Sequence, residues 1–160
     1  MIRNSILTAG AASLPSALSL AVESKPAVIP VALFEKPLEL LSDEELAGQL
    51  AAIGFDGVEA TVREGGRIEP ERAKDELPAL VGTLKESDLK VLIMASSISR
   101  SDQAYAEETL RTAALLGIKR YRLSKFHYDL KKPVIPQLDV LKTQLRDLAS
   151  LNRELGLTAV

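Results

Sequence analysis

A repeated unit, in which a helix is followed by a glycine turn and a short apolar strand, most strongly limits what this chain can fold into. It is clearest in residues 41–63, where an apolar helical pattern ends at Gly54 and an apolar strand follows at residues 57–62. Three further apolar segments end comparable units, at residues 89–94, 118–123 and 157–160. The spacing of roughly 30 to 40 residues is the size of one strand-plus-helix step. This alternation predicts an α/β fold with a parallel sheet and helices packed outside it.

The helix of the first unit has recognisable start and stop signals. Ser42 is followed three residues later by Glu45, which is the pattern of a capping box. Three residues at helical spacing predict one apolar face, namely Leu46, Leu50 and Ile53. Gly54 then supplies a residue that adopts the left-handed conformation at little cost. We therefore expect a helix that begins after Ser42, ends at Gly54 and packs against the sheet.

The remaining elements are predicted from similar signals. A first strand is expected at residues 28–34, with a proline near its start. A second helix is expected to be capped by Asp75, with Pro78 in its first turn, and a third to be capped by Ser101 or Asp102. The apolar face of a fourth helix is expected to contain Leu141, Leu145, Leu148 and Leu155. Together these elements make about four and a half strand-plus-helix units.

Composition excludes several classes of protein. The 160 residues contain no cysteine, so a disulfide framework, a cysteine nucleophile and thiolate zinc sites are excluded. The single histidine, His127, excludes any site built from two histidines of this chain. The net charge of −2, without a basic stripe, argues against a nucleic-acid partner.

The first 24 residues differ from the rest of the chain. One positive charge, Arg3, is followed by a run of small and apolar residues and by a small-x-small pattern at residues 19–21. This order is typical of a signal peptide, and the alternative is a disordered N-terminus. The run is too short and too rich in serine and proline to span a bilayer. We therefore predict export for a chain with a true signal, and a cytoplasmic location otherwise.

From residue 28 onward the chain resembles a known family of enzymes. The resemblance rests on VALFEKPLELLSDEELAGQLAAIGFDGVEATVREGGRIEPER, followed by DELPALVGTLKESDLKVLIM. Its most specific pieces are residues 54–59, the loop at residues 62–66 and the strand at residues 116–122, in that order and spacing. These features resemble the opening of the sugar phosphate isomerase/epimerase family, whose members are xylose isomerase-like (β/α)8 barrels.

The resemblance implies a fold and a reaction. Such barrels place their sites at the C-terminal ends of the strands. Members that bind a divalent metal take it from the fifth strand onward, and this chain ends within its fifth predicted strand. We therefore expect residues 25–160 to be the N-terminal half of a TIM barrel, as a fragment or as one half of an assembled barrel. The full-length enzyme would isomerise or epimerise a sugar by proton transfer next to its carbonyl, with help from a divalent metal.

In such a barrel, the charged residues at or near the predicted strand ends are the candidates for the site. Glu59 and His127 are the candidates for acid–base catalysis, although a lone histidine in a polar loop is often only solvated. The candidates for contacts with the substrate are Lys36, Glu59, Arg63, Arg122 and Lys125. Arg63 has the alternative of a surface ion pair with Glu35 or Glu64. The family often has a histidine where Arg67 stands, so an acid–base role at that position is doubtful.

Two other functions remain open at the level of sequence. One is a non-catalytic half-barrel that binds sugar or assists assembly. The other is the related barrel of apurinic-site endonucleases, which the charge balance and the scarcity of histidines disfavour. The expected partners are a sugar or sugar phosphate and, because a half-barrel has two unpaired sheet edges, further copies of the chain. No membrane span and no nucleic acid are expected.

Overall fold

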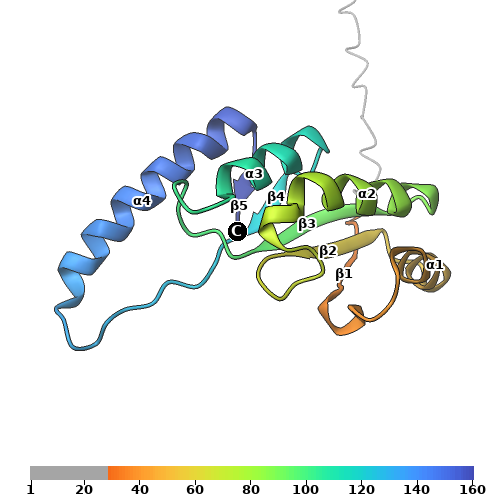
Figure 1. The fold of residues 1–160 in the computed structure, drawn as a ribbon, viewed down its shortest axis with the longest axis horizontal. Coiled ribbons are helices and arrows are strands. Elements are labelled where there is room, and N and C mark those ends of the chain that lie inside the picture. The colour runs from red at the N-terminus through yellow and green to blue at the C-terminus, as the bar shows by residue number, and fades with distance from the viewer. Residues whose placement is uncertain (1–28) are drawn as a thin grey trace, which may run out of the picture.

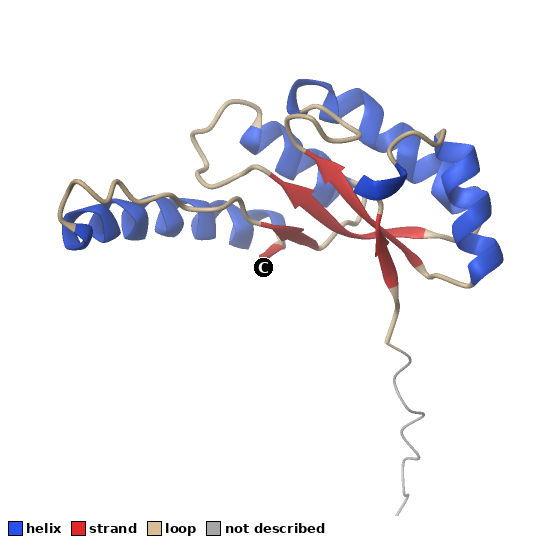
Figure 2. Cartoon of the chain, turned by 90° about the horizontal axis from the view of Figure 1, so that it is seen from below, coloured by secondary structure: helices blue, strands red, loops and turns tan. Residues whose placement is uncertain are grey.

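In the computed structural model, residues 29–160 form a parallel sheet of five strands with helices between successive strands (Figures 1 and 2). The strands are β1 (Ala32–Phe34), β2 (Gly57–Val62), β3 (Lys90–Ser96), β4 (Arg120–Arg122) and β5 (Thr158–Ala159). The helices are α1 (Asp43–Ile53), α2 (Ala73–Glu86), α3 (Ala106–Leu115) and α4 (Val134–Leu155). Strand order in the sheet follows chain order, so each helix makes the crossover between two neighbouring parallel strands.

The helices pack beside one another in the same order as the strands. Helix α1 contacts α2, α2 contacts α3, and α3 contacts α4, while α2 also packs on β3. The core lies between this helical layer and the sheet. Its fully buried strand residues include Val58, Ala60, Met94 and Tyr121, and its fully buried helix residues include Leu46, Leu50, Leu77, Leu80, Leu84 and Leu110. Burying one such side chain contributes about 1.5–3 kcal/mol.

Helix α1 and strand β2 confirm the predictions for the first unit. The Glu45 amide donates to Ser42 Oγ and the Ser42 amide donates to the Glu45 carboxylate, which completes the capping box. Gly54 caps the C-terminus with φ 93°, in the left-handed region. Strand β2 spans exactly the predicted residues 57–62. Ile53, however, is 70 % exposed, so the apolar face is narrower than the sequence suggested.

The first strand is shorter than the predicted residues 28–34. Strand β1 begins at Ala32, where its pairing with β2 starts, and before it the Val31 carbonyl accepts from the Asp56 amide at 2.9 Å. Pro30 has no N–H to donate, and the Val31 amide donates to the carboxylate of Asp56 at 2.7 Å. Strand β3 begins one residue after the predicted segment 89–94 and ends two residues beyond it, whereas β4 is shorter than the predicted segment 118–123 at both ends.

Two predicted helix starts are wrong. Helix α2 begins at Ala73, directly after a 3₁₀ turn at Pro70–Arg72, so Asp75 lies inside its first turn and Pro78 inside the helix. Helix α3 begins at Ala106 and not after Ser101 or Asp102. Before it, the Gln103 side-chain amide donates to the carbonyl of Ser97, and Tyr105 has a φ of 61°. These local contacts hold the preceding residues in turns.

Helix α4 only partly confirms the expected apolar face. Leu148 is fully buried and packs near Asn152 in the C-terminal part of the helix, whereas Leu145 is 37 % exposed. The N-terminal part of α4 extends away from the sheet together with the loop that precedes it (Figure 1). Its exposed apolar residues include Ile135 and Val140. The predicted signal peptide at residues 1–24 lies outside the described residues.

Candidate functional site

The side chains of β4 point alternately to the two faces of the sheet. Tyr121 is buried on the helical side, where its hydroxyl donates to Asn152 Oδ1 of α4 at 3.0 Å. Arg122 is the next residue and therefore points to the opposite face, which would be the inside of a closed barrel. Its Nε lies 3.2 Å from Oε1 of Glu59 on β2, two strands away. Glu59 and Arg122 thus meet on the inner face.

Phe34 joins this pair from β1. Its backbone is in register with Glu59, and its ring lies under the guanidinium of Arg122, 5.1 Å from ring centroid to Cζ. The Arg63 guanidinium lies over the same ring at 5.9 Å. Both distances are within the range of a cation–π contact. We call Phe34, Glu59, Arg63 and Arg122 the inner-face cluster.

The inner-face cluster is partly open to solvent and carries an excess of positive charge. The side chain of Glu59 is 17 % exposed and that of Arg122 is 45 % exposed. The cluster contains two guanidinium groups and one carboxylate. Within residues 29–160, Arg63 forms no ion pair, so the suggested surface pair with Glu35 or Glu64 is wrong. The cluster offers charged donors, one carboxylate acceptor and an aromatic surface, which together suit a polyhydroxylated ligand with an anionic group.

A second group of charges lies at the same end of the sheet and is buried. Glu35, directly after β1, is fully buried, and its Oε2 accepts from Arg67 Nε at 2.7 Å. The other oxygen of Glu35 accepts from the amide of Thr61 at 2.7 Å and from the Thr61 hydroxyl. Arg67 Nη1 also contacts Asp43 Oδ1 at 2.8 Å. We call Glu35, Asp43, Thr61 and Arg67 the Arg67 clamp.

The Arg67 clamp was not anticipated from the sequence. Arg67 also donates to the backbone carbonyls of Leu38 and Leu41, so it joins the loop after β2 to the loop after β1. Its guanidinium thus donates to four acceptors within the protein. The sequence signal that could have found it was the position of Glu35 and Arg67 after neighbouring parallel strands, whose carboxyl ends meet at one edge.

The two adjacent glycines in the loop after β2 serve the turn itself. Gly65 has a φ of 62°, and its amide donates to Glu69 Oε1 at 2.9 Å. A Cβ on Gly66 would lie 2.9 Å from the carbonyl oxygens of both Thr61 and Arg63. The side chain of Lys36 contacts the Glu39 carboxylate and the carbonyl of Gly65. Lys36 therefore joins the loop after β1 to the loop after β2. These contacts do not bring its ammonium group to the inner-face cluster.

Lys125 and His127 form no hydrogen bond or ion pair with the inner-face cluster. Both are exposed in the loop between β4 and α4, residues 123–133, which runs outward along α4 (Figure 1). Neither side chain makes a hydrogen bond or ion pair with another described residue. Of the six candidate residues, the structure brings Glu59, Arg63 and Arg122 together, and Phe34 joins them without having been predicted.

Residues 29–160 contain neither a cluster of metal ligands nor a membrane-spanning helix. No group of three or more His, Asp or Glu side chains lies close enough to hold a metal ion in this part of the chain. The described residues therefore do not fit a metal centre, and no chemical step is assigned to a metal here. None of the described helices is both long and apolar enough to cross a bilayer.

The fold can be compared with that of known proteins. No protein-family model and no curated protein matches the chain by sequence. Among solved structures, the chain is similar to D-psicose 3-epimerase, whose crystal structure was determined in the presence of D-fructose. The TM-score is 0.54 at 16 % sequence identity, and the match covers 82 % of this chain and 51 % of the epimerase. The chain therefore spans about half the length of that enzyme and has the fold of a partial (β/α)8 barrel, as found in this sugar epimerase.

Proposed function

We propose that this chain supplies the N-terminal half of a sugar isomerase or epimerase barrel, which transfers a proton next to the carbonyl of a ketose or an aldose. The observation that carries the proposal is the inner-face cluster, where β1, β2 and β4 bring together an aromatic ring, a carboxylate and two guanidinium groups. These groups lie on the face that lines the inside of a barrel. The partial barrel shared with a sugar epimerase supports the choice of sugar as the ligand class.

Each member of the cluster has a defined task in this proposal. Arg122 and Arg63 donate hydrogen bonds to sugar hydroxyls or to a phosphate group. Glu59 accepts a hydrogen bond from a hydroxyl and is the candidate for moving the proton, and its partner Arg122 fixes its orientation at 3.2 Å. The Phe34 ring supports the apolar C–H face of the sugar. A divalent metal remains an expectation for the rest of a full barrel.

The proposal is tested by measuring sugar binding to the full 160-residue chain. D-fructose, D-psicose and D-fructose 6-phosphate are titrated while backbone amide chemical shifts are recorded. We expect shifts at the ends of β1, β2 and β4, with the phosphate ester binding most tightly. Arg122→Gln should weaken binding by about tenfold, as expected for the loss of one charge-assisted contact. Arg146→Gln, at an exposed position of α4, is the matched control.

Binding of none of the three sugars, or equal effects of the two variants, would overturn the proposal.

A second candidate function is sugar binding without catalysis. It is favoured by the position of His127, which lies in an exposed loop without contact to the cluster. The two are separated by incubating D-fructose with the chain in D₂O. Deuterium gained at the carbon next to the carbonyl supports proton transfer, and binding without exchange supports the second function.

A further inference from the structure

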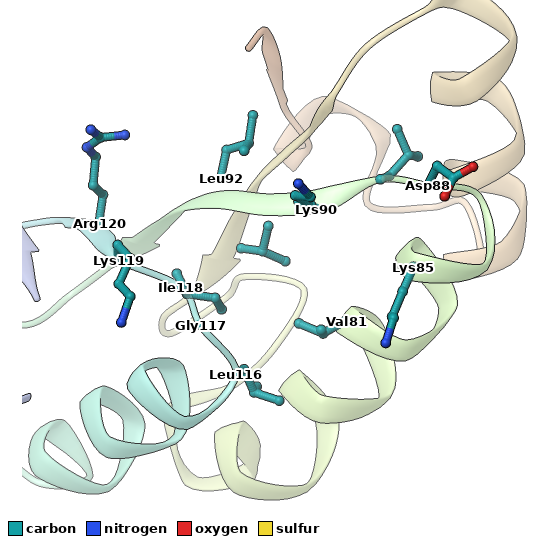
Figure 3. A pocket seen from close by; sticks show the side chains of 12 residues that line it. Val81, Lys85, Asp88, Lys90, Leu92, Leu116, Gly117, Ile118, Lys119 and Arg120 are labelled. Atoms are coloured by element: carbon teal, nitrogen blue, oxygen red, sulfur yellow. The ribbon is translucent and has the colours of Figure 1, made fainter. Parts of the chain in front are cut away.

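A cavity lies between β3 and β4 at the opposite end of the strands from the inner-face cluster (Figure 3). Strand β3 is paired with β2 from Lys90 onward, but with β4 only at Met94 and Ala95. The first residues of β3 therefore have no strand beside them on the β4 side. The two strands diverge there and leave a wedge-shaped space of about 620 Å³. This volume is within the range of small-molecule sites, roughly 300–1,000 Å³.

The interior of this cavity is apolar. Val91 of β3 and Ile118 before β4 are buried, and Val81 of α2 and Leu116 after α3 close the space on the helical side (Figure 3). Leu92 extends from the side of β3 opposite to Val81 and Leu116 and adds apolar surface there (Figure 3). A ligand with an apolar body can therefore bury surface in the cavity, at about 25 cal/mol for each Å² removed from water.

The rim of the cavity is strongly positive. Four cationic residues line it, namely Lys85, Lys90, Lys119 and Arg120, against one anionic residue, Asp88. All four are exposed, and none forms a hydrogen bond or an ion pair through its side chain with another described residue. Most other cations in the described chain have a carboxylate partner. The chain as a whole has a net charge of −2. The excess of unpaired cations is therefore a local property of this cavity.

We propose that this cavity binds a small organic anion with an apolar body, of the class of aliphatic carboxylates. The hydrocarbon part would lie against Val91 and Ile118, and the carboxylate would contact the rim cations on one side of the sheet. Charges beside an apolar surface interact more strongly than charges in open water, which favours the anion over a neutral analogue. The site does not involve the inner-face cluster, so it is independent of the proposed sugar site.

The cations divide into two pairs, which makes the experiment specific. Lys85 and Lys119 extend to one side of the sheet, whereas Arg120 extends to the other (Figure 3), and Lys90 is the rim cation on β3. The double variants K85Q/K119Q and K90Q/R120Q each remove one pair. The control variant K74Q/K142Q removes two lysines that form exposed ion pairs elsewhere, with Glu108 and Asp139. All substituted side chains are exposed, so the fold should be retained, as circular dichroism will verify.

Binding of octanoate and of 1-octanol to the full chain is measured by calorimetry and by amide chemical shifts. We expect octanoate to bind about tenfold more tightly than 1-octanol, with shifts at β3 and around residue 118. At least one of the two rim variants should remove most of this preference, and the control variant should keep it. Equal binding of the acid and the alcohol, equal behaviour of all three variants, or shifts elsewhere in the chain would overturn the proposal. Co-sedimentation with phosphatidylglycerol vesicles, without binding of free octanoate, would overturn it in favour of a lipid surface.

Discussion

The Arg67 guanidinium contacts four acceptors that come from separate positions along the chain. These are the carboxylates of Glu35 and Asp43 and the carbonyls of Leu38 and Leu41. The Arg67 side chain is 10 % exposed and that of Glu35 is fully buried. A buried carboxylate without its partner is strongly unfavourable, so the contribution of this arginine exceeds that of a surface ion pair.

We predict that Arg67→Met destabilises the fold by about 3–5 kcal/mol, because it leaves Glu35 buried and unpaired. The free energy of unfolding is measured by urea denaturation. Arg72→Met removes an exposed pair with Glu76 and should cost less than about 1 kcal/mol. The double variant Glu35→Gln/Arg67→Met should recover part of the loss. Equal costs for Arg67→Met and Arg72→Met would show that the clamp does not stabilise the fold.

Tyr121 gives the fold a dependence on alkaline pH. Burial raises the pKa of the Tyr121 hydroxyl above its ordinary value of 10.0. In the unfolded chain the hydroxyl ionises at lower pH than in the folded one. The stabilisation is therefore complete below pH 10.0 and is lost as the pH rises through the higher pKa of the folded state.

The predicted outcome is a fall in the free energy of unfolding above about pH 10 that is smaller in Tyr121→Phe. At neutral pH the variant should be less stable by about 1–2 kcal/mol, because Asn152 Oδ1 loses its donor in a buried position. Urea denaturation at several pH values measures both effects. Tyr128→Phe, at an exposed position in the β4–α4 loop, is the control. The same alkaline slope in Tyr121→Phe and wild type would contradict this assignment.

At the scale of elements, strands β2 and β3 approach each other too closely at Gly57 for a side chain to fit between them. A Cβ at this position would lie 2.0 Å from the carbonyl oxygen of Lys90 in β3. Gly57 is paired with Lys90 at the start of the β2–β3 ladder, and the ladder shifts register between Val58 and Glu59. Only a residue without a side chain allows the two backbones to approach in this way.

Two glycine-to-alanine substitutions should therefore change the stability of the fold in opposite directions. Gly57→Ala must push β2 and β3 apart and should destabilise the fold by more than about 2 kcal/mol. Gly48→Ala is placed in the interior of α1, where a Cβ meets nothing within 4 Å, and should stabilise by about 0.5–1 kcal/mol. Thermal unfolding of both variants measures the difference. A stabilising Gly57→Ala would mean that the two strands are farther apart than described.

At the scale of the whole molecule, the sheet has two edge strands that pair with no further strand of residues 29–160. Strand β1 forms one edge and β5 the other, as their places in the strand order require. Apolar residues are exposed next to both, with Val31 at 55 % and Val160 at 56 %. Free strand edges favour pairing with another chain.

We predict that the chain self-associates through these edges, with a sedimentation coefficient that rises with protein concentration. Val31→Lys places a charge at the β1 edge and should shift the equilibrium towards monomer. Val140→Lys is the matched control, because Val140 is similarly exposed at 58 % but lies on α4, away from the sheet edges. A wild-type chain that stays monomeric, or a larger effect of Val140→Lys, would contradict association through the sheet.

Much of the fold follows from local signals in the sequence. The capping box at Ser42, the left-handed Gly54 and the period of the apolar residues depend on neighbours within one turn, so they predict α1 and β2 correctly. The alternation of helices and strands likewise leads to the parallel sheet. Element ends were less predictable, because the start of α3 depends on the left-handed backbone of Tyr105 and the start of β1 on a hydrogen bond from Val31 to the distant Asp56.

Only the tertiary structure decided which charged side chains meet. The sequence placed Glu59, Arg63 and Arg122 near strand ends, but the strand order and register brought them around Phe34. The same packing paired Glu35 with Arg67 across 32 positions of the chain. Local patterns in the sequence indicate burial and secondary structure. An ion pair between distant residues depends instead on which strand ends lie side by side, and the packing of the whole sheet determines this.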